Sequence, residues 1–273
     1  GNTCYFNTAV QCLAHVPQLS NYLFKNKYSG DCPVTREYQL LVRELFSKSE
    51  TRPVCPLPLI GAFRGKFSRF DNLNQHDSQE VILCLIDTFE ETLGKEFIKK
   101  IFNGEETTET VYPGGRSTYR SDFVTMLFVL DGPSDLMDLI KNKNNFQKIS
   151  GYKDTEGTEH AEAETRTIVT RWPEIISFSF GMYGRKSTIK VPQEFEGKRL
   201  FAAVVHQGGP NGGVTHEMAG VIDGATWALR STEGAFLSQR LARRRGATSD
   251  PDMITTGPKS GPRTPTAPKR APP

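Results

Sequence analysis

The feature that most constrains the fold is a change in hydrophobic periodicity at Phe123. Before it, apolar residues recur at helical spacing in three segments, which begin at Cys4, near residue 35 and after Asn74. After it, apolar runs are short and rich in β-branched and aromatic residues. These runs cover residues 124–130, 174–182, 201–205, 218–222 and 226–230. Helices followed by strands predict an α+β fold, in which a helical lobe faces an antiparallel β lobe.

Composition and cysteine usage narrow the class of protein. Hydrophobic residues make up 37% of the 273, which is typical of a globular body. The cysteines are odd in number and form no CxxC pair, so we expect a reducing compartment, cytoplasmic or nuclear, without disulfides, metal or cofactor. No apolar run approaches membrane-spanning length, and no secretory signal opens the chain. The five cysteines are Cys4, Cys12, Cys32, Cys55 and Cys84.

Charge and proline content divide the chain near Arg240. Residues 240–273 carry a net +6 against +3 for the whole chain, which leaves −3 on residues 1–239. The Pro- and Lys/Arg-rich segment lacks periodicity, so we predict a folded domain over 1–239 and a disordered tail over 240–273. An acidic body favours a basic protein partner, with neither nucleic acid nor membrane as ligand, and we expect a monomer. Because the chain opens on Gly1, we expect a processed or trimmed piece of a longer protein.

The first helical segment carries a candidate nucleophile. Thr3 or Asn2 can cap this helix, which places Cys4 in or beside its first turn. There the free backbone N–H groups and the helix dipole favour a thiolate, the form that acts as a nucleophile. A buried cysteine that serves as a small apolar residue is the alternative, and it fits Cys12, two turns further on, better than Cys4.

The opening residues, GNTCYFNTAVQCL at positions 1–13, resemble the cysteine box of the ubiquitin-specific proteases, the papain-like deubiquitinases of peptidase class C19. The resemblance implies a papain-like two-lobed fold with Cys4 as the nucleophile. In that family an asparagine five residues before the cysteine helps to form the oxyanion hole. That position precedes Gly1, so Asn2 and backbone N–H groups are the donors that this sequence offers.

A second match lies at QHDSQE, residues 75–80, directly before an apolar helix closed by Gly94. Read alone, Asp77 and Glu80 are ordinary carboxylates at a helix start, with Asn74 as the cap and Asp77 in the first turn. The stretch also resembles the family's Gln-Gln-Asp-x-x-Glu signature. In the family the aspartate contacts the extended tail of ubiquitin, and the resemblance assigns that role to Asp77.

The candidate general base lies near the end of the domain. His206 and His216 flank a glycine-rich loop, and the arrangement resembles the family's histidine box. On that match His206 is structural, His216 is the base and Trp227 marks the last strand. The family's third triad member falls at Ser231, which can offer a hydroxyl. Asp223 is the nearest acidic alternative, but Asp223-Gly224 reads as the turn of a hairpin, which favours Ser231.

Residues 142–170 are polar and turn-rich, and we read His160 there as a solvated loop residue. The family usually carries a zinc-binding finger with two CxxC pairs at this place. The absence of cysteine here predicts a finger that is reduced or absent and binds no zinc.

The resemblance implies hydrolysis of the peptide or isopeptide bond after the C-terminal glycine of ubiquitin, with ubiquitin or ubiquitinated proteins as partners. Two alternatives stay open. One is a catalytically weak or inactive relative that binds ubiquitin as an interaction module. The other is a papain-like peptidase that acts on a precursor.

Overall fold

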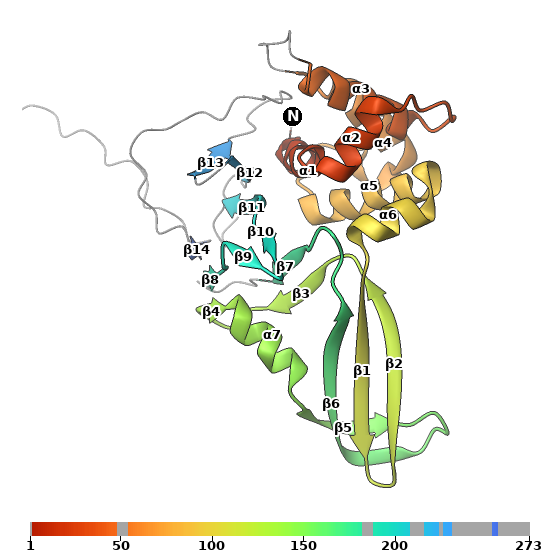
Figure 1. Ribbon diagram of the computed structural model, residues 1–273, viewed down its shortest axis with the longest axis vertical. Helices are drawn as coiled ribbons and strands as arrows, with labels where there is room; N and C mark the ends of the chain where they lie inside the picture. The colour runs from red at the N-terminus through yellow and green to blue at the C-terminus, as the bar shows by residue number, and fades with distance from the viewer. Residues whose placement is uncertain are drawn as a thin grey trace, which may run out of the picture.

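The computed structural model describes residues 2–47, 54–181, 188–207, 216–223, 226–230 and 253–255. A layer of helices occupies one end of the molecule, several small sheets form the middle, and a long sheet projects from the other end (Figure 1). The helical layer consists of α1 (Cys4–Ala14), α2 (Pro17–Lys25), α3 (Pro33–Leu45), α4 (Leu57–Lys66), the 3-10 turn η1 (Ser68–Phe70), α5 (Ser78–Leu93) and α6 (Lys95–Phe102).

The helical lobe is built around one apolar core. The periodic residues of the sequence supply it: Val10 of α1, Tyr38 of α3, and Leu85 and Phe89 of α5 are fully buried. The rings of Tyr38 and Phe89 meet at 4.8 Å between centroids. Proline sets two of the boundaries, because Pro17 and Pro33 each stand in the first turn of their helix, where a missing N–H costs nothing.

The start of α5 differs from our expectation. The helix begins at Ser78, and Asp77 is its N-cap, with the carboxylate accepting a hydrogen bond of 2.7 Å from the Gln79 N–H. Asn74 lies before the cap, in the preceding segment. Sequence alone admits both residues as caps, and the extended backbone of Asp77 decides which side chain reaches the free amides.

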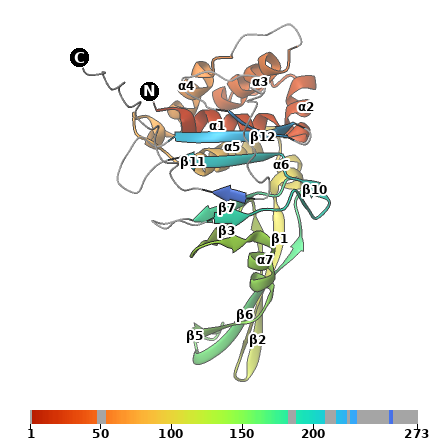
Figure 2. The ribbon, with the colours of Figure 1, turned by 90° about the vertical axis from the view of Figure 1, so that its left-hand side faces the viewer.

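A three-stranded antiparallel sheet covers one side of the helical lobe. It consists of β11 (Ala202–Gln207), β12 (His216–Asp223) and β13 (Thr226–Arg230), in the order β11-β12-β13. Strands β11 and β12 both contact α1, so the first helix is packed between the helical core and this sheet. Figure 2 shows β12 lying alongside α1. All three strands fall on runs that the sequence predicted to be strands.

The middle of the molecule holds smaller pairings and a second core. Strands β3 and β7 pair in parallel, β9 and β10 form a short hairpin, and the third sheet has the order β14-β8-β4. Leu130, Leu136 and Ile189 are buried in the second core. The elements are β3 (Met126–Val129), β4 (Ser134–Asp135), α7 (Leu136–Asn144), β7 (Phe178–Gly181), β8 (Thr188–Lys190), β9 (Glu194–Phe195), β10 (Lys198–Arg199) and β14 (Met253–Thr255).

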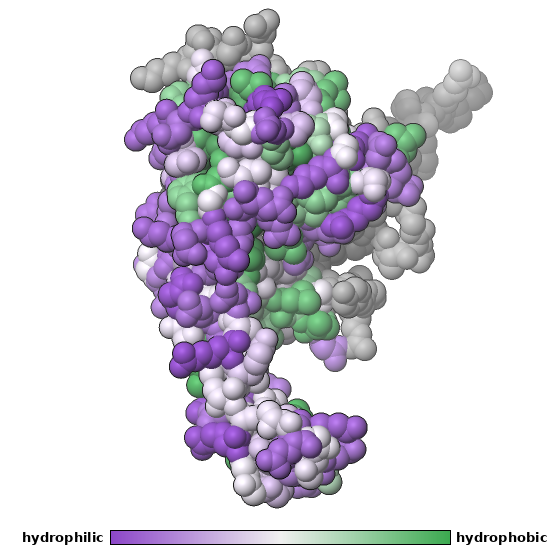
Figure 3. All heavy atoms as spheres, turned by 90° about the vertical axis from the view of Figure 1, so that its right-hand side faces the viewer, coloured by the Kyte–Doolittle hydropathy of each residue, from purple (hydrophilic) through white to green (hydrophobic). Residues whose placement is uncertain are grey.

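The projecting sheet, with the strand order β2-β1-β6-β5, corrects one of our expectations. Residues 142–170 contain strands where we expected a polar, turn-rich stretch. The expectation that the family's finger is reduced or absent here and binds no zinc stays a prediction. The strands are β1 (Gly104–Tyr112), β2 (Gly115–Phe123), β5 (Gln147–Lys153) and β6 (Glu159–Arg171), all antiparallel to their neighbours. Figure 3 shows that the surface of this end is largely hydrophilic, which is why hydrophobic periodicity did not reveal it.

Polar pairs between strands hold the projecting sheet. Thr108 and Thr110 of β1 hydrogen-bond across to Thr167 and Thr165 of β6, at 3.0 and 3.1 Å. Glu109 accepts from Arg166 of β6 at 2.7 and 2.8 Å and also pairs with an arginine of β2 at 2.9 Å. Cross-strand hydroxyl and opposite-charge pairs are the usual stabilising unit of a sheet that faces water.

Three residues of the segment that we predicted to be disordered form a strand. Met253–Thr255 is β14, which pairs antiparallel with β8 and forms one edge of the sheet β14-β8-β4. The predicted boundary between a domain over 1–239 and a tail over 240–273 stays a prediction. Within the described ranges, no helix combines the length and the apolar character that a bilayer span requires.

Candidate active site

Cys4 is the first residue of α1, as the sequence predicted. Thr3 is the N-cap residue, but its side chain makes no capping hydrogen bond, and its carbonyl oxygen accepts from the Asn7 N–H at 2.9 Å. The free N–H groups of the first turn therefore lie at the end of the helix that Cys4 begins. The residue is 7% exposed. The candidate nucleophile is thus at a helix N-terminus and almost covered.

The cover comes from the segment that precedes α5. The Cys4 thiol donates to the side-chain oxygen of Gln75, with 3.4 Å between Sγ and Oε1. The Asn2 amide donates to the carbonyl oxygen of Leu73 at 2.8 Å. Two residues of the cysteine box, Asn2 and Cys4, thus contact the segment that contains Leu73 and Gln75, at the start of the second signature. The partners are about seventy positions apart in the chain. One hydrogen of the Asn2 amide is used in this contact, so the predicted oxyanion donor is partly engaged.

His76 anchors the same segment. Its Nε2 lies 2.8 Å from Oδ1 of Asn72, and its ring packs against Tyr5 and Phe70 at centroid distances of 5.1 and 4.8 Å. Tyr5 and Phe70 are themselves buried. The hydrogen bond and the two ring contacts hold the backbone next to Gln75 in one place. His76 therefore has a structural role in the site.

Asp77 is exposed at the edge of this region. Its carboxylate caps α5, as described above, and still presents its outer face to solvent. Glu80 pairs with Arg69, with 2.8 Å between Nε and Oε1. Gln79 accepts a short hydrogen bond from Ser179 of β7, which ties the start of α5 to the middle of the molecule. Asp77 is the acidic side chain of the signature that has no ion-pair partner among the described residues.

The two candidate histidines stand at successive positions of one strand pairing. His216, the first residue of β12, pairs with Gln207, and His206 pairs with Glu217. Successive positions of a strand belong to opposite faces of a sheet, so only one of these two positions lies on the face that β12 turns toward α1. The backbone thus brings the strand that begins at His216 against the helix that begins at Cys4. The assignment of His216 as the base stays a prediction.

The predicted third member, Ser231, lies outside the described residues. Strand β13 pairs antiparallel with β12, from Thr226 opposite Asp223 to Arg230 opposite Ala219. The chain therefore runs back along β12 in the direction of His216 as it approaches Ser231. Asp223 stands at the opposite end of β12. A strand that runs in this direction carries the chain toward His216 at Ser231 and leaves Asp223 at the far end, which is the arrangement that favours Ser231 as the third member.

Cys12, which the sequence favoured as the structural cysteine of this helix, is half-buried. It lies two turns into α1, and burial raises the pKa of its thiol to about 12. A thiol with such a pKa stays protonated at neutral pH and is a poor nucleophile. The two cysteines of α1 therefore differ in setting, one at the helix end and one within the lobe.

His160, read from the sequence as a solvated loop residue, is instead part of β6. Its Nε2 lies 2.9 Å from Oδ2 of Asp154, and the two side chains are 13% and 10% exposed. Its ring lies over Tyr112 at 4.4 Å. The hydrogen bond from His160 is the main cause that lowers the pKa of Asp154. In the part of the chain that the structure describes, no three His, Cys, Asp or Glu side chains group closely enough to hold a metal ion.

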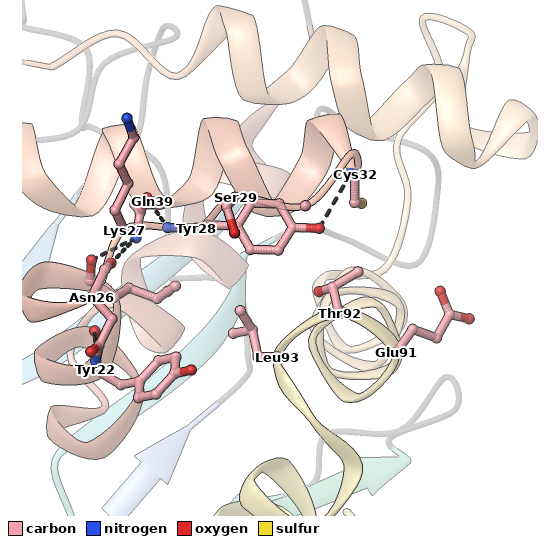
Figure 4. A pocket seen from close by; sticks show the side chains of 12 residues that line it. Tyr22, Asn26, Lys27, Tyr28, Ser29, Cys32, Gln39, Glu91, Thr92 and Leu93 are labelled. Atoms are coloured by element: carbon pink, nitrogen blue, oxygen red, sulfur yellow. Dashed lines mark hydrogen bonds between the residues drawn. The ribbon is translucent and has the colours of Figure 1, made fainter.

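A pocket of about 520 Å³ lies away from the candidate active site. It is lined by the end of α2, the turn that follows it and the last turn of α5, with Tyr22, Tyr28 and Leu93 facing it (Figure 4). Asp77 caps the opposite end of α5, next to the segment that covers Cys4. The pocket therefore contributes nothing to the chemistry at Cys4.

The comparison with protein families agrees with the site geometry. The family described as ubiquitin carboxyl-terminal hydrolase matches residues 1–216. Ubiquitin carboxyl-terminal hydrolase 5 of Arabidopsis thaliana is 33% identical over 120 residues, which are 39% of this chain and 12% of that relative. Ubiquitin carboxyl-terminal hydrolase 12 of Saccharomyces cerevisiae is 35% identical over 115 residues, 37% of this chain and 9% of that relative. The matched segment thus spans only a small part of either relative.

Solved structures confirm the fold class. The SAGA Ubp8/Sgf11/Sus1/Sgf73 DUB module bound to ubiquitin aldehyde matches with a TM-score of 0.67 at 15% identity. A second structure of the same module, bound to monoubiquitin, matches with a TM-score of 0.71 at 17% identity. Each match covers 88% of this chain and 64% of the other. The predicted α+β fold is thereby confirmed.

Proposed function

Because the chain belongs to the ubiquitin carboxyl-terminal hydrolase family, we propose that it is a thiol-dependent deubiquitinase. Its substrate is the peptide or isopeptide bond after the C-terminal glycine of ubiquitin. Cys4 is the nucleophile, His216 the general base, Ser231 the third member and Asn2 a donor to the oxyanion. The observation that carries the proposal is the packing of α1, which begins at Cys4, against β12, which begins at His216.

The chemistry follows from these roles. His216 takes the proton of the Cys4 thiol, and the sulfur attacks the carbonyl carbon of the terminal glycine. The carbonyl oxygen becomes an oxyanion, which N–H donors at the start of α1 and Asn2 stabilise. The C–N bond then breaks while His216 returns the proton to the amine. Water, activated by the same imidazole, hydrolyses the thioester and frees the cysteine.

Substrate recognition is proposed to use Asp77. The acidic body of the chain suits a basic, extended peptide tail, as does the exposed carboxylate of Asp77, which has no ion-pair partner among the described residues. Gln75, two residues earlier, touches the Cys4 sulfur, so Asp77 lies on the same short segment as the thiol's cover. A substrate tail whose last residue reaches Cys4 would pass this segment. The C-terminal tail of ubiquitin is basic and extended, so it suits this path.

A second candidate function is ubiquitin binding without efficient catalysis. Two observations favour it. The position that the resemblance gives to the third triad member holds Ser231, whose hydroxyl orients and stabilises an imidazolium less well than a carboxylate does. The amide of Asn2 is already engaged with the Leu73 carbonyl. Loss of one oxyanion donor lowers rates by about two to three orders of magnitude.

Incubation with a ubiquitin probe that carries a C-terminal electrophile tests the proposal. The wild-type chain should form a covalent adduct, Cys4→Ala should form none, and Cys12→Ala should react like the wild type. Adduct formation without turnover of a ubiquitin-coumarin substrate would identify the binder with a reactive thiol. In that case Ser231→Asp should raise turnover and Asp223→Ala should leave it unchanged. An adduct that persists in Cys4→Ala would overturn the assignment.

The same assay tests Asp77, provided that the cap is preserved. Asp77→Ala removes the N-cap of α5 as well as the charge and is expected to destabilise the helix by about 1 kcal/mol. Asp77→Asn keeps a capping oxygen and removes only the charge. Asp77→Asn should therefore weaken ubiquitin binding with little change in melting temperature. Equal ubiquitin affinity in Asp77→Asn and wild type would leave Asp77 with its capping role alone.

A further inference from the structure

We propose that Gln75 is a further catalytic residue, whose carboxamide is the hydrogen-bond partner of the Cys4 sulfur both before and after the thiol loses its proton. In the resting thiol its Oε1 accepts the S–H hydrogen, and in the thiolate its Nε2–H donates to the sulfur. The inference rests on the proposed function in one respect, that Cys4 is the nucleophile. It adds a group that tunes this nucleophile and that the sequence motifs did not assign.

The contact itself is the first observation. Gln75 Oε1 lies 3.4 Å from Cys4 Sγ, a normal distance for a hydrogen bond that involves sulfur. Cys4 is 7% exposed, and Gln75 is half-buried above it. The thiol therefore has little access to water, and the carboxamide is the polar side chain that replaces it. Within the described ranges, Nε2 of Gln75 has no protein partner.

The second observation is that Gln75 is held in place from both sides. On one side the Leu73 carbonyl is bound by Asn2, and on the other His76 is fixed by Asn72 and by the aromatic rings under it. Asp77, two residues on, is locked as the cap of α5. These contacts fix the backbone at Gln75, so its side chain can move only by rotation about its own torsions. A fixed backbone keeps the carboxamide beside the Cys4 sulfur, as a preorganised catalytic contact requires.

The chemical step places opposite demands on this partner before and after proton transfer. When the S–H bond breaks, the proton goes to the general base and the electron pair stays on sulfur. A carbonyl oxygen facing the thiolate is then repelled, whereas an N–H donor stabilises it. Rotation about the last torsion of Gln75 exchanges Oε1 for Nε2, and this torsion is broad and nearly two-fold. The donor adds to the effect of the helix N-terminus at Cys4.

Steric cover is the competing role for Gln75, and the two roles have opposite consequences. If the side chain only shields the sulfur, its removal exposes the thiol and speeds its modification. If it stabilises the thiolate, its removal raises the thiol pKa and slows modification at neutral pH. Methionine has similar length and bulk without a strong hydrogen bond, so Gln75→Met keeps the cover and removes the donor. Gln75→Glu keeps the shape and places a carboxylate at the sulfur.

The experiment is the pH dependence of alkylation by iodoacetamide, followed at each cysteine separately by mass spectrometry. Gln75→Glu should lower the rate at Cys4 at pH 7 by more than about tenfold, because a carboxylate beside the sulfur raises the thiol pKa by at least about one unit. Gln75→Met should lower it by about tenfold through loss of the donor. Gln18→Glu, the same change on an exposed position of α2, should leave it unchanged. Melting temperatures and circular dichroism of all variants verify folding.

Two outcomes overturn the inference. An unchanged pH profile of Cys4 alkylation in both Gln75→Met and Gln75→Glu would exclude a tuning role. Faster alkylation in Gln75→Ala, with Gln75→Met like the wild type, would reduce Gln75 to steric cover. The readout needs no ubiquitin, so these failures are separate from a failure of the proposed function. A shifted thiol profile in a chain that never hydrolyses ubiquitin would overturn the proposed function and leave the Gln75–Cys4 coupling standing.

Discussion

The helical lobe and the projecting sheet are stabilised by different interactions. In α5 the apolar positions Val81, Leu85 and Phe89 are fully buried, and each faces the core of the lobe. In β2, which is nine residues long, no residue is buried, and β6 buries one of its thirteen. The sheet depends instead on threonine pairs and on ion pairs between its strands.

This contrast teaches that two parts of one chain can be stabilised by interactions that differ in strength and in their response to salt. Apolar burial stabilises by about 25 cal/mol per Å² and is not subject to the screening by salt that weakens charge pairs. Ion pairs at a partly exposed sheet contribute less, and salt screens them over roughly a Debye length. The two regions should therefore respond differently to truncation, to salt and to acid.

The largest effect should follow from truncation in the helical core. Phe89→Ala removes a fully buried ring that packs on Tyr38, and we expect it to destabilise the protein by about 3–5 kcal/mol. Tyr119→Ala is the matched control in the sheet, because this residue is 69% exposed, and the substitution should cost less than about 0.5 kcal/mol. Chemical denaturation measures both. Similar costs for the two variants would remove the contrast between the regions.

A smaller effect is expected from the central ion pairs of the sheet. Glu109 is 13% exposed and is held by arginines from both neighbouring strands, so Glu109→Gln should cost about 1 kcal/mol. Amide hydrogen exchange in β1 and β6 should accelerate, while exchange in α5 should not change. Glu162→Gln, an exposed change in β6, is the control. Added salt should weaken the wild-type sheet and should have little effect on Glu109→Gln; equal sensitivity would contradict the ionic account.

The smallest effect concerns acid and the tip of the sheet. The pKa of Asp154 is lowered in the fold, first by its hydrogen bond from His160, so its ionised form stabilises the folded tip. That stability is present above the ordinary pKa of 3.8 and is lost as pH falls below it through the folded value. The protection of the amides between β5 and β6, measured relative to their intrinsic exchange rates at each pH, should therefore fall in this acid range. In Asp154→Asn the tip should exchange faster at neutral pH and lose this acid dependence; a wild-type profile in that variant would rule out the carboxylate.

Sequence analysis succeeded where burial dictates the structure. The helical spacing around Leu85 predicted α5, which is defined by the apolar face it buries, and the β-branched runs at 218–222 and 226–230 predicted β12 and β13. It failed for β1 and β2, whose threonines, glutamates and arginines have no apolar alternation. Pro113-Gly114 was the available signal, since Gly114 has φ +92° in the two-residue turn between these strands.

The sequence predicted part of the candidate site and missed part of it, as it did for the fold. The motifs indicated Cys4 and Asp77 as candidates, and the structure brings their two segments together through Asn2 and Gln75. Gln75 is part of the second motif, but the motif assigns it no role. Its contact with the sulfur stands beside the hydrogen bond between the Asn2 amide and the Leu73 carbonyl, and each of the two joins residues 71 positions apart. No local pattern carries such a contact, because the tertiary packing of the two segments creates it.

The packing of α1 against β12 also has a consequence for synthesis of the chain. About 200 residues lie between this helix and its strand, so their contact is among the most non-local in the molecule. A ribosome delivers the helix that begins at Cys4 first and the strand that begins at His216 long afterwards. A nascent chain can assemble the helical lobe before the partner strand of α1 has been made. The chemistry proposed for Cys4 and His216 would therefore become possible only late in translation.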